Sequence, residues 1–337
     1  MSYVAGALLV VLATACWSTS GTFINLILRS SDLTPWGLAF WRDLATFVCL
    51  FAGLAILRPG LLRVRRADLP WLAAAGSVGV GLMHIMWNTS VILNGVAVST
   101  VIQCNAPIFV TLMAWRLWRE PVTGRKMAAI ALSFVGTILI ARLYDLGGVH
   151  ITMLGLLLSL GAAVTYGIMS LLAKKLVGTY SPLTVLVYAF GFATLVLIPF
   201  QASGPLPQGA IWDYRPLATT GAPAYRHLLV PVSPPPCENR GLPQLVGYFA
   251  GLVLLTTITG FLLYTIGLRR LPVSVASIVA TTEVPFAAVL SFFTLGERLD
   301  AWQMVGAASV VGAVALLSWP QQMRSAVSSH QATPAAG

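Results

Sequence analysis

The chain has 337 residues, of which 57% are hydrophobic and only 9% are charged, and its formal net charge is +10. Its mean hydropathy is +0.84. A water-soluble domain of this length needs far fewer apolar residues to fill its core, so the composition excludes a soluble enzyme or a soluble binding domain. We therefore predict an integral membrane protein.

Ten apolar segments follow one another along the chain. A hydrocarbon core about 30 Å thick requires about 20 apolar residues per helix, and each segment is close to that length. The predicted spans cover 3–28, 35–57, 69–93, 96–117, 124–142, 151–173, 182–200, 245–268, 273–295 and 302–319. The predicted fold class is an all-α polytopic membrane protein with ten transmembrane helices.

The positive charge is concentrated in alternate connections. Most of the 20 Lys and Arg residues lie in four even-numbered connections and in the tail, at Arg58–Arg66, Arg116–Lys126, Lys174–Lys175, Arg269–Arg270 and Arg324. The positive-inside rule then predicts that both termini are cytoplasmic and that the protein spans the cytoplasmic membrane several times. Because this distribution accounts for the charge, we expect no nucleic-acid partner.

Two segments do not fit the pattern of short loops. The stretch at about 201–244 is rich in proline and glycine and is predicted to be an extracytoplasmic insertion, with a lid or docking role as the alternative. Residues 320–337 are predicted to form a disordered cytoplasmic tail. Three of the four cysteines lie within predicted spans, so we expect neither a disulfide framework nor a metal site.

The second half of the chain repeats the first. The segment "GALLVVLATACW" at 6–17 matches "GLLLSLGAAVTY" at 155–166, and "NAPIFVTLMAWRLW" from 105 matches "EVPFAAVLSFFTL" from 283. Five spans per repeat is an odd number, so the second copy must be inverted in the membrane. The predicted repeats are 1–145 and 146–319. Inverted repeats are typical of secondary transporters, whose substrate cavity lies at the repeat interface.

Each repeat resembles the EamA-type repeat of the drug/metabolite transporter superfamily. The likeness rests on "STVIQCNAPIFVTLMAWRLWREPVTGRKMAAIALSFVGTILIA" and "SVASIVATTEVPFAAVLSFFTLGERLDAWQMVGAASVVGAVALL", in which a small-residue helix, a proline, an apolar run and a Gly-rich helix follow one another. The resemblance implies ten helices around a central cavity. It also implies transport of small metabolites, often efflux of amino acids or related compounds.

Polar and aromatic residues inside the spans are candidates for the transport pathway. They are Trp17, Arg42, His84, Trp87, Asn88, Gln103, Asn105, Tyr166 and Glu283, and the predicted helix bends are Pro107 and Pro285. A polar face of a membrane helix turns towards protein or water rather than lipid. Each candidate also has a structural alternative: hydrogen bonds between helices, satisfaction of a backbone carbonyl freed by proline, aromatic packing or, for Arg42, snorkelling or pairing with an acid.

Glu283 is the most unusual of these residues. An ionised carboxylate near the bilayer centre costs a few kcal/mol, so we expect it to face the protein interior. The repeat alignment pairs it with Asn105, which cannot titrate. Glu283 could pass on a proton or meet the amino group of a substrate. The alternatives are a neutral acid bonded to a neighbouring helix and a structural ion pair.

Secondary transport accounts for these features better than other membrane functions. No span carries the paired acids or histidine cluster that an enzyme would need, and no selectivity motif points to a channel. We predict no cofactor and no metal, a small-molecule substrate, membrane lipids as partners, and coupling to protons or another ion as an open possibility. An exporter of lipophilic or cationic drugs is the alternative substrate class, and a receptor or scaffold is the alternative function class.

Overall fold

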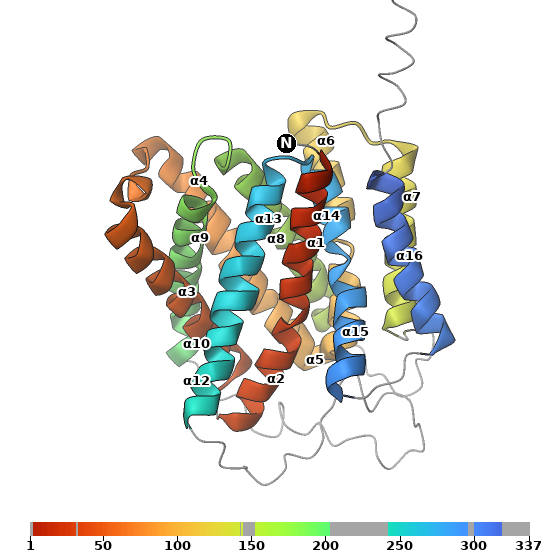
Figure 1. Ribbon diagram of the computed structural model, residues 1–337, viewed down its shortest axis with the longest axis horizontal. Helices are drawn as coiled ribbons and strands as arrows, with labels where there is room; N and C mark the ends of the chain where they lie inside the picture. Colours follow the sequence, from red (N-terminus) through yellow and green to blue (C-terminus); the bar gives the residue numbers. More distant parts are fainter. Residues whose placement is uncertain are drawn as a thin grey trace, which may run out of the picture.

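The computed structural model describes residues 3–31, 33–141, 143, 152–202, 242–295 and 300–318. These residues form helices and short connections, with no β-strand among them (Figure 1). Nearly all of the predicted 201–244 insertion and the predicted tail lie outside the described residues.

The described residues of the first half form seven α-helices, two short 3₁₀-helices (η1 and η2) and one π-helical segment (η3). They are α1 (Tyr3–Ser18), α2 (Ser20–Ser30), α3 (Pro35–Leu57), η1 (Pro59–Leu62), η2 (Arg66–Asp68), α4 (Leu69–Ala74), η3 (Ala75–Leu82), α5 (Met83–Gln103), α6 (Ala106–Trp118) and α7 (Gly124–Ile140).

The second half has a similar series. It contains α8 (Met153–Leu176), α9 (Pro182–Leu197), α10 (Pro199–Ala202), α12 (Leu242–Gly251), η4 (Leu252–Thr259), α13 (Gly260–Leu268), α14 (Val273–Ala280), α15 (Glu283–Leu295) and α16 (Ala301–Ser318).

Local sequence specifies where several of these helices begin. The Thr34 hydroxyl accepts a hydrogen bond from the Gly37 N–H at 3.0 Å, and Pro35 occupies the first turn of α3. Ser181 caps α9 in the same way, with Pro182 following it. A capping hydroxyl satisfies one free N–H of the first turn, and proline there has no N–H to leave unpaired.

The all-α polytopic fold class is confirmed. Seven helical segments of the described chain are long and apolar enough to cross a membrane: Tyr3–Leu28, Pro35–Leu57, Arg66–Val91, Val98–Trp118, Met153–Leu176, Leu242–Leu268 and Val273–Leu290. Two shorter apolar helices cover Pro182–Leu197 and Ala301–Leu317. These nine segments match nine of the ten predicted spans, and α7 lies over the tenth; the number of ten crossings stays a prediction.

The helix α5 is not straight. The hydroxyls of Ser90 and Ser99 lie 2.7 Å apart, although nine residues of straight helix would separate them by about 13 Å along the axis. The backbone therefore reverses direction between them. This reversal explains why α5 contains the end of one predicted span and the beginning of the next.

Several irregular features recur at a constant spacing in the two halves. The two π-helical segments η3 and η4 each have eight residues, and their first residues, Ala75 and Leu252, are 177 positions apart. The non-helical turns at Cys104–Asn105 and Thr281–Thr282 have the same spacing, and each lies just before one of the predicted bends, Pro107 and Pro285. These equivalences support the proposed division into two repeats.

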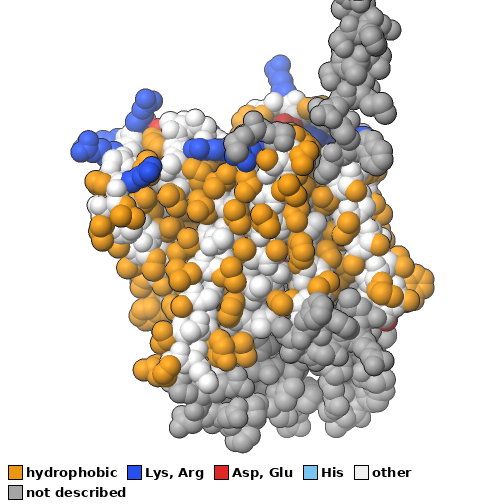
Figure 2. Space-filling view, in the orientation of Figure 1, with side chains coloured by type: hydrophobic (Ala, Val, Ile, Leu, Met, Phe, Trp, Pro, Cys, Tyr) orange, Lys and Arg blue, Asp and Glu red, His pale blue; other side chains and the backbone are white. Residues whose placement is uncertain are grey.

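The outer surface is apolar along the sides of the molecule and basic at one end (Figure 2). Figure 2 shows hydrophobic side chains over the sides of the molecule, with Lys and Arg gathered at the end where the N-terminus lies in Figure 1. Side chains more than half exposed include Leu8, Ile56, Leu112, Leu157, Leu195 and Val311. An apolar surface of this extent suits contact with lipid rather than water.

The helices α7 and α16 form a pair at one side of the molecule (Figure 1). They approach closely because both have glycine at the contact: a Cβ atom added at Gly136 would lie 2.6 Å from the Gly306 carbonyl oxygen, and one added at Gly306 would lie 2.6 Å from the Gly136 carbonyl oxygen. Small residues at such crossings permit the close backbone approach on which helix association in lipid depends.

Candidate functional site

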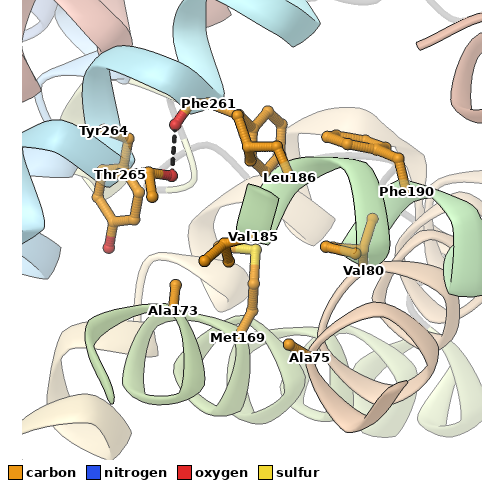
Figure 3. A pocket seen from close by; sticks show the side chains of 11 residues that line it. Ala75, Val80, Met169, Ala173, Val185, Leu186, Phe190, Phe261, Tyr264 and Thr265 are labelled. Carbon is orange, nitrogen blue, oxygen red and sulfur yellow. Dashed lines mark hydrogen bonds between the residues drawn. The ribbon is translucent and has the colours of Figure 1, made fainter. Parts of the chain in front are cut away.

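A small internal cavity lies between η3, α8, α9 and α13 (Figure 3). Its volume is about 20 Å³, which is room for about one water molecule. The lining is almost entirely apolar, with Met169, Phe190 and Phe261 among the largest side chains. None of the nine predicted pathway residues lines this cavity. The cavity lies where η3 of the first predicted half packs against α8, α9 and α13 of the second.

An aromatic cluster adjoins the cavity and contains two of the predicted residues. The ring of Tyr264, a cavity-lining residue, lies 5.2 Å from the ring of Trp17 and 6.3 Å from the ring of Tyr166. Phe261 packs edge-on against Trp17 at 5.1 Å. Tyr264 therefore brings together Trp17 of α1 and Tyr166 of α8, the pair that the repeat alignment identifies as equivalent.

Two buried polar atoms of this cluster, the Trp17 Nε1 and the Tyr166 hydroxyl, make no hydrogen bond of good geometry among the described residues. The Tyr166 hydroxyl nevertheless lies close to the hydroxyls of Tyr264 and Ser170. By contrast, the Tyr264 hydroxyl lies 2.9 Å from the Ser170 hydroxyl. A buried polar group left unpaired costs free energy, so such groups are uncommon unless a water or a ligand completes them.

Glu283 begins α15 beside this cluster. It is only partly exposed and lies within electrostatic reach of the Tyr166 hydroxyl and the Cys104 thiol. No hydrogen bond or ion pair reaches its carboxylate from the described residues, so the structural ion pair considered for this acid is absent among them. Immediately before it, the Thr282 hydroxyl lies 2.8 Å from the Thr14 hydroxyl of α1. Glu283 is thus held at a junction of both halves, with its carboxylate unpaired.

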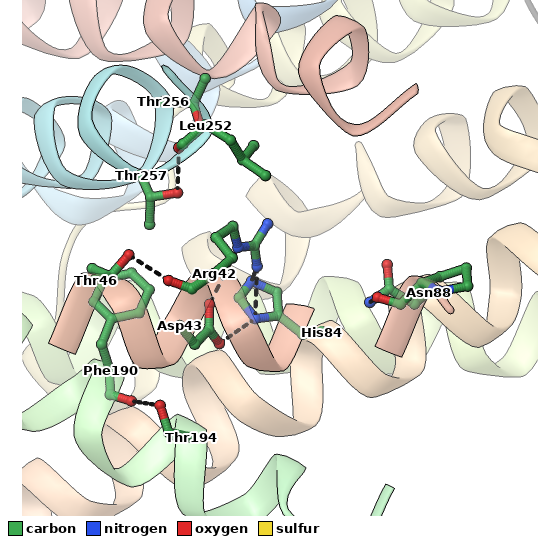
Figure 4. Close-up of polar contacts among 11 residues, drawn as sticks. Arg42, Asp43, Thr46, His84, Asn88, Phe190, Thr194, Leu252, Thr256 and Thr257 are labelled. Atoms are coloured by element: carbon green, nitrogen blue, oxygen red, sulfur yellow. Dashed lines mark hydrogen bonds and ion pairs between the residues drawn. The ribbon is translucent and has the colours of Figure 1, made fainter. Parts of the chain in front are cut away.

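A second cluster contains Arg42, Asp43 and His84 (Figure 4). The Arg42 Nε lies 3.2 Å from Asp43 Oδ1, and His84 Nδ1 lies 2.9 Å from Asp43 Oδ2. One terminal nitrogen of Arg42, Nη2, lies 2.7 Å from His84 Nε2 and 3.0 Å from His84 Nδ1, so it packs over the face of the imidazole ring. Asp43 is fully buried, and the Arg42 side chain is 15% exposed. The structure therefore supports internal pairing of Arg42 with an acid, the alternative that sequence left open.

The remaining predicted residues are Trp87, Asn88, Gln103 and Asn105, which make other contacts. The Asn88 amide donates to the Pro35 carbonyl at 3.5 Å, and the Asn105 amide donates to the Ile102 carbonyl at 2.9 Å. The carbonyl that Pro107 leaves without its helical donor is that of Gln103, so this bond does not satisfy it, and the structural role considered for Asn105 stays a prediction. Trp87 has its indole N–H buried without a described partner, and Gln103 is partly buried at the end of α5.

Three important residues were not among the sequence candidates. Asp43 links Arg42 to His84, Tyr264 joins Trp17 to Tyr166, and Ser170 orients the Tyr264 hydroxyl. The signal for Asp43 was its position beside Arg42 in a predicted span. For Tyr264 and Ser170, the sequence shows only a polar atom inside an apolar helix, which is common in membrane proteins. Among the described residues, no group of His, Cys, Asp and Glu could hold a metal ion.

Polar contacts join the two predicted halves at both ends of the molecule. At the end nearest the N-terminus, Glu120 accepts a hydrogen bond from the Val273 N–H at 3.1 Å, and the Tyr188 hydroxyl donates to the Leu62 carbonyl at 2.8 Å. At the opposite end, Asn94 Oδ1 accepts from the N–H of Thr152 at 2.8 Å and from its hydroxyl at 2.7 Å. The aromatic cluster around Tyr264 and the Arg42–Asp43–His84 cluster therefore lie between two ends at which hydrogen bonds join the predicted halves.

Comparisons with known proteins agree with this architecture. The chain is 24% identical over 326 residues to an uncharacterized transporter of Bacillus subtilis, YwfM, covering 96% of this chain and 97% of that protein. It is 28% identical over 193 residues to an uncharacterized transporter of Archaeoglobus fulgidus, covering 57% and 66%. A Streptantibioticus cattleyicolor protein named a probable terminal-alkyne amino-acid exporter is 24% identical over 308 residues, with 91% of each chain covered.

A solved crystal structure and a family model extend the comparison to the whole fold. The crystal structure superposes with a TM-score of 0.70 at 15% identity and covers 93% of this chain and 96% of its own, which shows a shared fold. The family model described as the EamA-like transporter family matches residues 4–142 and again residues 153–319. The chain therefore belongs to the EamA-like transporter family.

Proposed function

We propose that this protein is a secondary transporter that exports a small amino compound, such as an amino acid, across the cytoplasmic membrane by alternating access. The observation that carries the proposal is the unpaired Glu283 carboxylate beside the aromatic cluster of Trp17, Tyr166 and Tyr264. This position lies at a junction of both halves, where secondary transporters with inverted repeats bind their substrates.

The chemistry of this position suits an ammonium group. A carboxylate attracts a cation, and the faces of Trp and Tyr rings attract it further through their quadrupoles. The unpaired Trp17 Nε1 could donate a hydrogen bond to an acceptor of the same molecule, and the Tyr166 hydroxyl could donate or accept one. The printed name of the Streptantibioticus relative, a probable amino-acid exporter, supports the same substrate class and the outward direction.

The contacts that fasten the two ends support alternating access. Glu120, Tyr188 and Asn94 each bond to the other predicted half through one or a few hydrogen bonds. A net contribution of about 1 kcal/mol per hydrogen bond is small enough for one end to open while the other stays closed. The halves could then rock about the central site.

Flux in liposomes that contain only this protein tests the proposal. We expect uptake of radiolabelled amino acids above that of protein-free vesicles, with competition among a panel of amino acids, nucleosides and cationic dyes to define the class. Preferential transport of the dyes would favour the drug-exporter alternative. Absence of flux for every compound in the panel would contradict transport and favour a receptor or scaffold.

Cysteine labelling tests the proposed orientation. In a cysteine-free version, a single cysteine placed between residues 203 and 241 is expected to react with a membrane-impermeant maleimide in intact cells. A single cysteine at Arg63–Arg66, within the basic end of the molecule, should react only after the cells are permeabilised. Labelling of the Arg63–Arg66 position in intact cells would overturn the assignment of both termini to the cytoplasm.

A further inference from the structure

Basic side chains from both predicted halves gather on one side of the basic end of the molecule, where α3, α4 and α9 meet in Figure 1. The connection between α3 and α4 contributes four arginines, and the second half contributes a lysine near the end of α8 and an arginine just after α13. All six side chains are exposed. We call them the basic corner: Arg58, Arg63, Arg65, Arg66, Lys175 and Arg269.

Three hydrogen bonds hold the segments of the basic corner together. The Tyr180 hydroxyl, in the turn between α8 and α9, donates to Asp68 Oδ2 at 2.6 Å and accepts from the Arg65 N–H at 3.2 Å. Arg269 Nη2 donates to the Tyr180 carbonyl at 2.6 Å. Tyr180 therefore joins the connection of the first half to two segments of the second half.

The basic corner has little negative charge to balance it. The acid within it, Asp68, already accepts the hydrogen bond from Tyr180. None of the six basic side chains forms an ion pair with an acid of the described chain. Because like charges that are held close together repel one another, a bound anion would be favourable here.

Lys175 is positioned for such an anion. Its Nζ lies 3.2 Å from the centre of the Trp71 ring, a cation–π contact that fixes the ammonium group and leaves N–H donors facing away from the ring. In the described part of the chain this nitrogen has no hydrogen-bond acceptor, whereas the neighbouring Lys174 donates to the Leu271 carbonyl at 2.8 Å. The free donors of Lys175 suit a phosphate oxygen.

The basic corner borders the apolar side of the molecule. Ile56 and Leu57, just before Arg58 at the end of α3, are each 79% exposed. Trp71, in the first turn of α4, is 44% exposed, and tryptophan is typical of the interface between lipid and water. Cations thus lie next to exposed apolar side chains, so an anion that carries acyl chains matches this surface better than a free anion does.

We propose that the basic corner binds an anionic phospholipid, with Arg65, Arg66 and Lys175 at its phosphate and Trp71 beside its acyl chains. The positive-inside rule accounts for the number of charges at this end, but not for their convergence around Tyr180 from both halves. Because the site contains residues of both halves, the bound lipid bridges them. A lipid that binds only the folded arrangement also stabilises it by mass action.

Lipid binding to the purified protein tests the proposal. In native mass spectrometry, we expect phosphatidylglycerol to bind about 10-fold more tightly than phosphatidylcholine with the same acyl chains, because only the former has a net negative charge. Phosphatidylglycerol should also raise the thermal unfolding midpoint in detergent. Glycerophosphoglycerol, the same headgroup without acyl chains, should not. Equal stabilisation by this soluble compound would indicate a site for a free phosphodiester and overturn the lipid proposal.

Matched charge removals test the location of the site. Arg66→Gln with Lys175→Gln should weaken phosphatidylglycerol binding about 10- to 30-fold. The control is Arg116→Gln with Arg119→Asn, which removes two exposed charges at the end of α6; Asn suits the left-handed backbone of Arg119, whose φ is 54°. The control should bind lipid like wild type, and both variants should keep the wild-type unfolding midpoint in lipid-free detergent.

Two results would contradict a site at the basic corner. One is equal weakening in the two double variants, because the lipid would then respond only to the total charge of this end. The other is a wild-type protein that binds phosphatidylglycerol and phosphatidylcholine equally well. Neither result bears on transport of the amino substrate, because the basic corner lies away from Glu283 and the aromatic cluster.

Discussion

Replacing Glu283 by Gln is expected to reduce transport of the amino substrate by about 10- to 100-fold, because a charge-assisted bond contributes about 1.5–3 kcal/mol and Gln keeps the shape without the charge. The variant should fold normally, since no described residue donates to or pairs with this carboxylate. Initial rates in liposomes, together with thermal stability in detergent, measure the two effects.

Two further measurements identify the origin of that loss. Glu283→Asp keeps the charge on a shorter side chain and should restore part of the transport rate. If the role of Glu283 were only structural, the Gln variant would lose thermal stability along with transport. Wild-type flux with wild-type pH dependence in Glu283→Gln would contradict a role for this carboxylate in the substrate site.

Replacing Gly306 by Val should destabilise the protein by about 1–3 kcal/mol, the usual cost of forcing extra atoms into a well-packed contact. An added Cβ at this position would lie 2.6 Å from the Gly136 carbonyl oxygen and 2.9 Å from the Leu139 Cβ, and neither backbone can yield without separating α7 from α16. Thermal unfolding followed by size-exclusion chromatography in detergent measures the change.

The same helix offers a matched control. A Cβ at Gly312 of α16 would lie 3.6 Å from the Leu132 Cδ2, an ordinary van der Waals distance, so Gly312→Val should change stability much less. Both substitutions also carry the same change in helix propensity, which cancels in the comparison. Equal losses of stability in the two variants would show that the close crossing of α7 and α16 does not contribute.

The membrane-spanning organisation was determined largely by sequence. The predicted spans 3–28 and 35–57 coincide with Tyr3–Leu28 and Pro35–Leu57, and 273–295 overlaps Val273–Leu290. This agreement has a local cause: a helix must keep its backbone hydrogen bonds within itself in lipid, and its length is set by the bilayer. The family resemblance was also readable from the two repeated segments and is confirmed by the family match.

The partners of the polar residues were decided by tertiary structure. Sequence placed Arg42 and His84 in separate spans, but only the fold brings their nitrogens to 2.7 Å, and only the fold inserts Tyr264 between Trp17 and Tyr166. A polar side chain in a membrane helix indicates that its face turns away from lipid. Which neighbour it meets depends on the rotation, depth and crossing of two helices, and these follow from packing over the whole surface of both.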